Sequence, residues 1–227
     1  MNKIAIVVAG GSGLRMGAAL PKQFLPVGGK PIFLHSIDAF LHAYAGIRIV
    51  LVMSREYCPM AKSLLEEHHY PDSIEIVEGG MTRFHSVKNG LSRINGESLV
   101  FIHDAVRCLL SADLIKRCGD AAIQMGSAIP VIPVRDSIRR LDTDTNLSAV
   151  VPREGLFIVQ TPQVFLGSII LPAFEVEYNA GFTDEASVLE ASGHAVHLVE
   201  GEERNIKITF PEDLAFAEWK LSSSANQ

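Results

Sequence analysis

The sequence predicts an α/β fold with a mainly parallel, twisted sheet, helices on both faces and one protruding β-arm. Strand-like and helix-like segments alternate along most of the 227 residues, which is typical of such sheets. Residues 4–9, "IAIVVA", form a continuous apolar run, as expected of a strand that is buried on both faces. Residues 135–160 break the alternation with a polar stretch around the turn signal "DTDTN". We expect this stretch to leave the sheet as a hairpin, either a surface hairpin or an arm that packs on a second subunit.

The order of the expected elements is Rossmann-like. The expected helices at 32–45 and 82–94 carry apolar side chains at helical spacing. Ser111 is a plausible N-cap of one helix, and Pro211 suits the first turn of the closing helix. The expected strands are residues 4–9, 47–53, 73–78, 98–103, 127–134, 194–201 and 205–210. The expected helices are residues 32–45, 57–69, 82–94, 111–125 and 211–221.

Composition indicates one globular domain over residues 1–227. A net charge of −6 argues against a nucleic-acid partner, and the apolar runs are shorter than the roughly 18 to 20 residues of a membrane span. The three cysteines form no C-x-x-C pair, and we recognise no signal peptide ahead of the first strand. We therefore expect a reduced, cytoplasmic protein.

The loop after the first strand, "AGGSGLRMGAALPKQFLP", is rich in glycine and carries two cations. It matches neither a Walker A motif nor G-x-G-x-x-G. Successive glycines let backbone N–H groups converge on one anion, and Arg15 and Lys22 add positive charge at either end. The loop thus favours a triphosphate ligand, although a glycine-rich turn with solvated basic residues would look similar.

Two further candidate sites follow predicted strands, at the carboxyl ends where ligands bind in such sheets, and a third lies inside a predicted strand. In "HDAVR", Asp104 suits a divalent cation or a ligand hydroxyl and Arg107 a phosphate; alternatively Asp104 caps a turn and pairs with Arg107. "GGMTRFHSV" suits a ligand-facing turn that opens a helix, or a plain turn and cap. Lys207, inside "NIKIT", either reaches an edge or points into a site.

Covalent catalysis has no candidate residues in this sequence. The eight histidines show no metal-ligand spacing, and there is no G-x-S-x-G or paired Cys/His arrangement. Cations outnumber candidate bases at the predicted strand ends. This balance fits a reaction in which phosphates are positioned and their charge is neutralised.

Taken together, these motifs resemble a known family. "AGGSGLRMG…PKQFLP" resembles nucleotidyltransferases that join a nucleoside monophosphate to a phosphorylated sugar or polyol. "GGMTRFHSV", "HDAVR", "PVRDS", "QTPQVF", "TDEAS" and "NIKIT" narrow this to the 2-C-methyl-D-erythritol 4-phosphate cytidylyltransferases of the non-mevalonate isoprenoid pathway. Ribitol-5-phosphate cytidylyltransferases share most of these motifs and are the alternative. Sugar 1-phosphate or molybdopterin guanylyl transfer and a catalytically silent nucleotide binder are weaker alternatives.

The resemblance implies a cytidylyl transfer from CTP with Mg²⁺ or another divalent cation as cofactor. It implies catalytic roles for Arg15, Lys22 and Lys207, and a metal contact for Asp104. The nucleotide-binding residues that it implies are Ala9, Gly10, Gly11, Ser12, Gly13, Gly80, Arg83, Ser86, Asp104 and Ala105. The polyol-phosphate-binding residues that it implies are Asp104, Arg107, Ser137, Arg153, Thr183 and Lys207. It further implies a homodimer in which the arm at about 135–160 completes the polyol-phosphate site of the partner.

Overall fold

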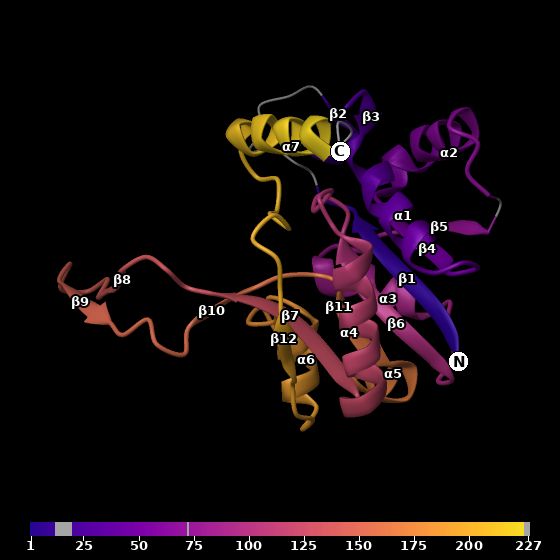
Figure 1. Ribbon diagram of the computed structural model, residues 1–227. Helices are drawn as coiled ribbons and strands as arrows, with labels where there is room; N and C mark the ends of the chain where they lie inside the picture. Colours follow the sequence, from indigo (N-terminus) through magenta and orange to yellow (C-terminus); the bar gives the residue numbers. More distant parts are fainter. Residues whose placement is uncertain (12–19, 72, 225–227) are drawn as a thin grey trace.

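The computed structural model describes residues 1–11, 20–71 and 73–224, and within them one sheet organises the molecule (Figure 1). Its eight strands run in the order β10-β7-β11-β6-β1-β4-β5, and β12 pairs with β7. The strands are β1 (Asn2–Ala9), β4 (Arg48–Met53), β5 (Ile74–Glu78), β6 (Ser98–Asp104), β7 (Ser127–Pro133), β10 (Phe157–Val159), β11 (Gln163–Leu166) and β12 (Leu198–Glu200). β6, β1, β4 and β5 are parallel, so the predicted mainly parallel sheet is confirmed.

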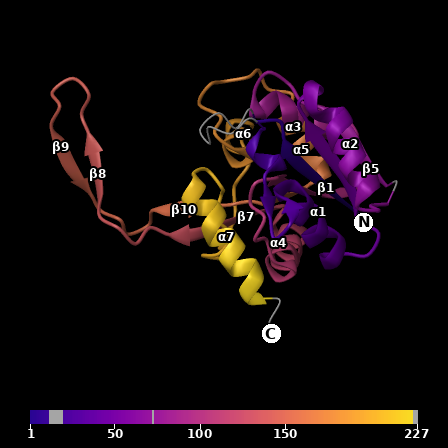
Figure 2. The same cartoon turned by 90° about the horizontal axis from the view of Figure 1, so that it is seen from above.

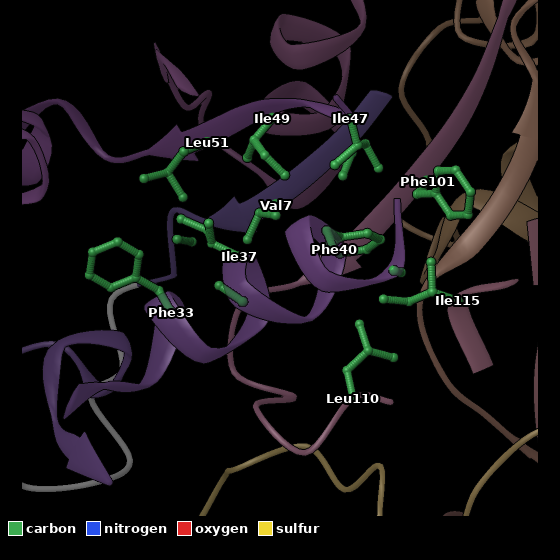
Figure 3. Packing of buried hydrophobic residues seen from close by; sticks show 14 of the residues in the cluster. Val7, Phe33, Ile37, Phe40, Ile47, Ile49, Leu51, Phe101, Leu110 and Ile115 are labelled. Atoms are coloured by element: carbon green, nitrogen blue, oxygen red, sulfur yellow. The ribbon is translucent and has the colours of Figure 1, made fainter. Parts of the chain in front are cut away.

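Helices cover both faces of the sheet, as predicted. On one face lie α1 (Ile32–Ala43), α2 (Cys58–Glu67) and α4 (Ala112–Met125). Figure 3 shows this core, in which the rings of Phe40 and Phe101 meet edge to face at 5.8 Å between centroids. On the other face lie α3 (Arg83–Leu91), α5 (Gly167–Ala173) and α6 (Glu185–Ala191). The central strands are mostly apolar because side chains of both faces enter a core.

Gly90 sets the distance between α3 and the sheet. A Cβ atom at this position would lie 2.7 Å from Cγ2 of Ile6 on β1 and 3.0 Å from Cγ2 of Val52 on β4. Glycine therefore lets the helix approach the strands closely, which brings the first turn of α3 to the carboxyl ends of the strands.

The closing helix α7 (Pro211–Ser224) packs on a third, smaller core. This core joins it to Val106, Ile208 and the turn between the short strands β2 (Pro26–Val27) and β3 (Lys30–Pro31). The short helices η2 (Lys22–Phe24) and η3 (Arg55–Tyr57) connect the larger elements. None of the helices in the described parts of the chain is long and apolar enough to cross a membrane.

The arm is a separate two-stranded sheet of β8 (Ile138–Leu141) and β9 (Ser148–Val151). Figure 2 shows that it projects away from the body of the molecule. The predicted limits of 135–160 were too wide, because Phe157–Val159 form β10 and pair with β7 of the main sheet. The prediction of a hairpin excursion is confirmed, with this shorter extent.

Two other expectations need correction. Residues 205–210 form no strand. Their backbone makes isolated hydrogen bonds to the rest of the molecule, such as that from the Ile208 N–H to the Val106 carbonyl at 3.0 Å. The expected strand at 194–201 is reduced to β12. Strand β11 and helix α5 were not predicted.

Candidate active site

Two adjoining cavities open at the carboxyl ends of β1 and β6. The larger cavity has a volume of about 620 Å³ and the smaller about 250 Å³. Their walls share three charged side chains, Arg83, Asp104 and Lys207. Because β1, β4, β5 and β6 are parallel, the residues that follow them gather at one edge of the sheet. The larger cavity has the size of a small-molecule site.

Buried polar side chains hold the glycine-rich backbone of the larger cavity. Gln23 is 2% exposed, and its Nε2 donates to the carbonyls of Ala9 at 2.7 Å and Gly11 at 3.1 Å. The backbone N–H of Gly80 donates to Oγ of Ser86 at 3.0 Å. A Cβ atom on Gly80 would lie 2.3 Å from the Cβ of His85, so only glycine allows this tight turn onto α3.

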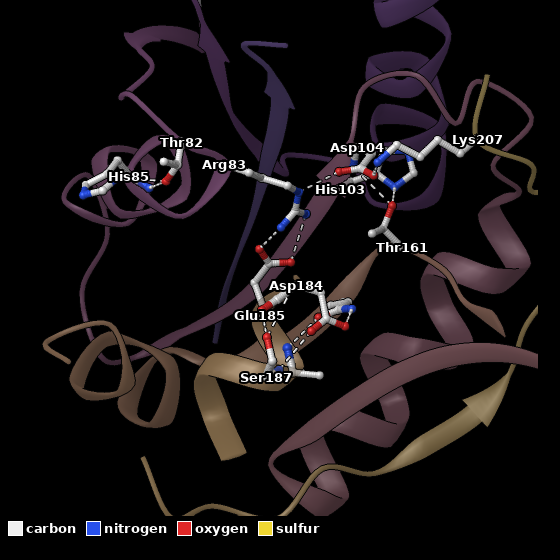
Figure 4. Close-up of polar contacts among 12 residues, drawn as sticks. Thr82, Arg83, His85, His103, Asp104, Thr161, Asp184, Glu185, Ser187 and Lys207 are labelled. Carbon is white, nitrogen blue, oxygen red and sulfur yellow. Dashed lines mark hydrogen bonds and ion pairs between the residues drawn. The ribbon is translucent and has the colours of Figure 1, made fainter. Parts of the chain in front are cut away.

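A cluster of alternating charges lies between the two cavities (Figure 4). Nε of Arg83 donates to Oδ1 of Asp104 at 3.0 Å, and Nζ of Lys207 lies 2.8 Å from Oδ2 of the same carboxylate. The two Nη groups of Arg83 donate to the carboxylate of Glu185. The expected alternative of an Asp104–Arg107 side-chain pair does not occur, since the partners of Asp104 are Arg83 and Lys207.

Asp104 is an anion in this setting. Burial by itself raises the pKa of its carboxyl, but Arg83 and Lys207 outweigh burial and hold the pKa well below its usual range. Its backbone N–H donates to Oγ1 of Thr161 at 3.1 Å, and Nδ1 of His103 lies 2.9 Å from that hydroxyl. Asp104 is thereby fixed both through its backbone and through its side chain.

Lys22 links the start of the chain to residues near its closing helix. Its Nζ donates to the carbonyl of Ile208 at 2.6 Å, and Lys22 lines the larger cavity together with Lys207. Two ammonium groups from opposite ends of the sequence therefore border one space. Such a pair suits a ligand that carries several negative charges.

In the smaller cavity, Arg107 and Thr183 lie near the shared charges. Arg107 is 9% exposed, and its Nη groups donate to the carbonyls of Asn205 at 2.7 Å and Val159 at 3.2 Å. A guanidinium anchored in this way keeps its charge beside the cavity without a carboxylate that neutralises it directly. This cavity suits a smaller anionic ligand next to the occupant of the larger one.

Comparison with known proteins identifies the family to which this chain belongs. The family model for IspD, 2-C-methyl-D-erythritol 4-phosphate cytidylyltransferase, matches residues 3–223. The chain belongs to the 2-C-methyl-D-erythritol 4-phosphate cytidylyltransferase family. A relative with this name from Bacteroides thetaiotaomicron is 48% identical over 94% of this chain and 97% of its own length. Another from Geobacillus kaustophilus is 40% identical over 98% of each chain.

Solved structures of similar proteins have the same fold. The 4-diphosphocytidyl-2C-methyl-D-erythritol synthase of Anaerococcus prevotii has a TM-score of 0.82 and 30% identity, covering 97% of this chain and 98% of its own. The 2-C-methyl-D-erythritol 4-phosphate cytidylyltransferase of Thermus thermophilus has a TM-score of 0.77 and 31% identity, covering 98% and 100%. The predicted Rossmann-like class is therefore confirmed for this family member.

Most residues that the resemblance implied lie together at the two cavities. Those that line the larger cavity are Ala9, Gly10, Gly11, Lys22, Gly80, Arg83, Ser86, Asp104 and Lys207. Arg107 and Thr183 line the smaller cavity. Ser12, Gly13 and Arg15 lie outside the described residues. Their proposed roles stay predictions.

Three implied residues lie elsewhere. Ala105 is fully buried beneath the site, where its carbonyl accepts from Oγ of Ser36 at 2.9 Å and its side chain lines neither cavity. Ser137 and Arg153 lie on the arm, and neither lines a cavity of its own chain. Their expected contribution to a partner's site stays a prediction.

Sequence reasoning missed the side chains that brace the site, namely Gln23, Thr161 and Glu185. Each lies inside or beside a motif that had been noticed, "PKQFLP", "QTPQVF" and "TDEAS". The letters give no clear signal, because each of the three follows another polar residue, and a buried polar group is recognised only by its specific partner. The partner itself is not visible in the sequence.

The donor set fits Mg²⁺ that is carried mainly by a substrate. Asp104 is the one carboxylate among the described residues that line the larger cavity, and no group of three or more His, Cys, Asp or Glu able to hold a metal occurs in the part of the chain that the structure describes. Mg²⁺ in proteins is commonly held by one or two carboxylates together with waters and substrate phosphates. Asp104 meets that requirement, whereas an all-protein metal cage is not present among these residues.

Proposed function

We propose that this chain transfers the cytidylyl group of CTP to 2-C-methyl-D-erythritol 4-phosphate, releasing pyrophosphate and forming 4-diphosphocytidyl-2-C-methylerythritol in isoprenoid biosynthesis. One observation carries the proposal: two cavities of different size share a wall of Arg83, Asp104 and Lys207. A reaction between two phosphates requires two anion sites with a common boundary. Family membership over residues 3–223 names the pair of substrates.

CTP occupies the larger cavity and the acceptor phosphate the smaller one. An oxygen of the acceptor phosphate forms a bond to the α-phosphorus, and the bond from that phosphorus to the bridging oxygen of pyrophosphate breaks. The attacking oxygen is already anionic, so no general base is needed. Catalysis then consists of positioning and of stabilising the charge on the α-phosphate.

Lys207 has the central place in this scheme. It borders both cavities, and Asp104 holds its ammonium group at the shared wall. Lys22 reaches the larger cavity from the other side. Arg107 and Thr183 receive the acceptor phosphate, while the turn at Gly80 and Ser86 borders the nucleotide.

We propose Mg²⁺ as the cofactor, bound by Asp104 and the phosphates of CTP. The cation would supply charge neutralisation on the triphosphate. Asp104 supports this role because Arg83 and Lys207 keep its carboxylate ionised, and each carboxylate oxygen has lone pairs beyond those used by these two partners.

We also propose a cytoplasmic homodimer in which the arm reaches the partner's smaller cavity. Within the described residues, the strands of the arm pair only with each other, and the arm exposes Leu141, Leu147 and Val150 by 56%, 70% and 68%. Ser137 and Arg153 at its base would face the acceptor phosphate across the interface. The free thiols of the three cysteines agree with a reducing compartment. Sedimentation that finds a fully active monomer would contradict the dimer.

The decisive assay is pyrophosphate release with CTP and Mg²⁺, in which 2-C-methyl-D-erythritol 4-phosphate and ribitol-5-phosphate are compared as acceptors. Faster release with ribitol-5-phosphate would reassign the acceptor, and faster release with UTP or GTP would reassign the base. Lys207→Met should lower kcat by roughly 10²-fold, as loss of one charge-stabilising donor does. Lys116→Met, on the exposed face of α4, is the matched control and should leave kcat unchanged.

A further inference from the structure

Glu185 is a buried carboxylate outside both cavities. Its side chain is 1% exposed, and it lines neither cavity. Both of its oxygens accept from the Nη groups of Arg83, one of them at 3.1 Å. Burying a charge costs free energy unless the charge is paired and hydrogen-bonded. The burial of Glu185 therefore indicates that its carboxylate has a function.

The first turn of α6 holds Glu185 rigidly. Asp184 caps this helix by accepting from the N–H of Ser187 at 2.9 Å. Gln163, on β11, donates to Oδ2 of Asp184 at 2.9 Å and accepts from the N–H of Ala186 at 2.9 Å. The carboxylate therefore projects from a helix start that is fastened to the central sheet.

From Glu185 a line of alternating charges leads to the shared wall. Both Nη groups of Arg83 donate to Glu185, and Nε of Arg83 donates to Oδ1 of Asp104. The other oxygen of Asp104, Oδ2, is thereby left for Nζ of Lys207 at 2.8 Å. Figure 4 shows Arg83 between the two carboxylates, with Lys207 on the far side of Asp104.

Without Glu185 this division of hydrogen bonds would not hold. A guanidinium prefers a bidentate contact with a carboxylate, and among the described residues Asp104 is the other carboxylate that pairs with Arg83. Arg83 would turn to take both oxygens of Asp104 and compete with Lys207 for Oδ2. The ammonium group would then lose the contact that fixes its position.

We propose that Glu185 is a positioning residue that acts through Arg83 and Asp104 to fix the ammonium group of Lys207 at the wall between the two cavities. This inference rests on the proposed function and extends it to a residue that contacts neither substrate site. Burial alone lowers the pKa of the Arg83 guanidinium, but Glu185 and Asp104 together raise it, in keeping with a permanently charged link. The sequence "TDEAS" thus supplies a helix cap and a support for the site.

Glu185→Gln tests the proposal by the division between kcat and KM. The variant keeps the size of the side chain and removes its charge. We expect kcat to fall by about 10- to 100-fold, because a misplacement of about 1 Å can cost roughly 10²-fold, while KM for CTP changes less than about threefold. Glu190→Gln, on the exposed side of the same helix, should match the wild type. An unchanged kcat in folded Glu185→Gln would overturn the proposal.

A double-mutant cycle with Lys207→Met separates positioning from general damage. If Glu185 acts through Lys207, then Glu185→Gln should change kcat by less than about twofold once Lys207 is absent. Equal fold losses in both backgrounds would overturn the inference. Pyrophosphate release by the wild type tests the proposed function independently. If the wild type is active and the two substitutions have independent effects on kcat, the role of Glu185 is rejected while the proposed function stands.

Thermal unfolding is measured for every variant, because removing one charge of a buried ion pair can destabilise the fold. If Glu185→Gln does not fold, Glu185→Asp replaces it in the same double-mutant cycle. This variant keeps the charge and shortens the side chain by one methylene. Its loss of turnover should be smaller and should vanish in the Lys207→Met background. Wild-type turnover in Glu185→Asp, or equal losses in both backgrounds, would then overturn the proposal.

Discussion

His103 makes the stability of the fold depend on pH. Its ring is fully buried next to Asp104, with Phe40 edge to face at 5.6 Å and Nε2 without a hydrogen-bond partner among the described residues. Burial lowers the pKa of the imidazole to about 3, and Arg107 adds to the effect against the opposing charge of Asp104. An unfolded histidine has a pKa of about 6.5. Between these two values the unfolded chain binds a proton that the folded chain does not.

The free energy of unfolding must therefore fall as the pH falls through this window. The contribution is complete above about pH 6.5 and is lost at about 1.4 kcal/mol per pH unit as the pH drops toward 3. From pH 7 to pH 5 the expected loss is about 2 kcal/mol. Other groups titrate as well, so the test compares the wild type with His103→Gln, which lacks the titrating ring.

Urea unfolding at half-unit steps between pH 7 and pH 5 gives the measurement. The variant starts from a lower stability because the packing against Phe40 changes, but its curve should be flatter by about 2 kcal/mol over the range. Parallel curves for the two proteins would refute the reasoning, since they would mean that the histidine takes up a proton equally well in both states.

Two further substitutions test the site. Asp104→Asn leaves Arg83 and Lys207 without their shared carboxylate. Because Lys207 is 43% exposed and Arg83 keeps Glu185 as a partner, we expect the free energy of unfolding to fall by about 1.5 to 2 kcal/mol in a urea titration; an unchanged value would contradict this pairing. Gly80→Ala places a Cβ atom 2.3 Å from that of His85, so the turn must move, and KM for CTP should rise by roughly tenfold. Gly96→Ala is the control in the same initial-rate assay, because a Cβ atom at Gly96 would have no neighbour closer than 3.8 Å. Equal KM values for the two variants would contradict a role of the turn at Gly80 in binding CTP.

The parallel core of the sheet could be predicted because its strands are apolar on both faces. Residues 205–210 were wrongly predicted to form a strand, also because of the pattern of their apolar side chains. The alternation in "NIKITF" is that of a strand, but here it reflects two different neighbours. Ile206 and Ile208 pack toward the core under α7, whereas Lys207 faces the cavities. A period of two shows that alternate side chains face opposite sides, and it does not show that the backbone has a partner strand.

Arg83 and Arg107 could be predicted near the site because they follow strands, whereas for Lys207 the sequence left two possibilities open. The side chains that support these cations could not be predicted. Arg83 was expected to face a ligand, and the structure directs its guanidinium to two carboxylates. One of them, Glu185, is 102 residues away in sequence. Its motif, "TDEAS", contributed only to the family resemblance, because sequence spacing carries no information on which helix start lies under which strand end.

The hydrogen bond between Lys22 and Ile208 joins residues that are 186 positions apart in the sequence. This separation determines when the two residues can meet during synthesis of the chain. At about 5 to 20 residues per second, Ile208 leaves the ribosome roughly 10 to 40 seconds after Lys22. The strands around Asp104 are complete well before Lys207 exists to pair with its carboxylate. A nascent chain can thus assemble the strands around Asp104 while it still lacks Lys207, so the wall between the two cavities is completed last.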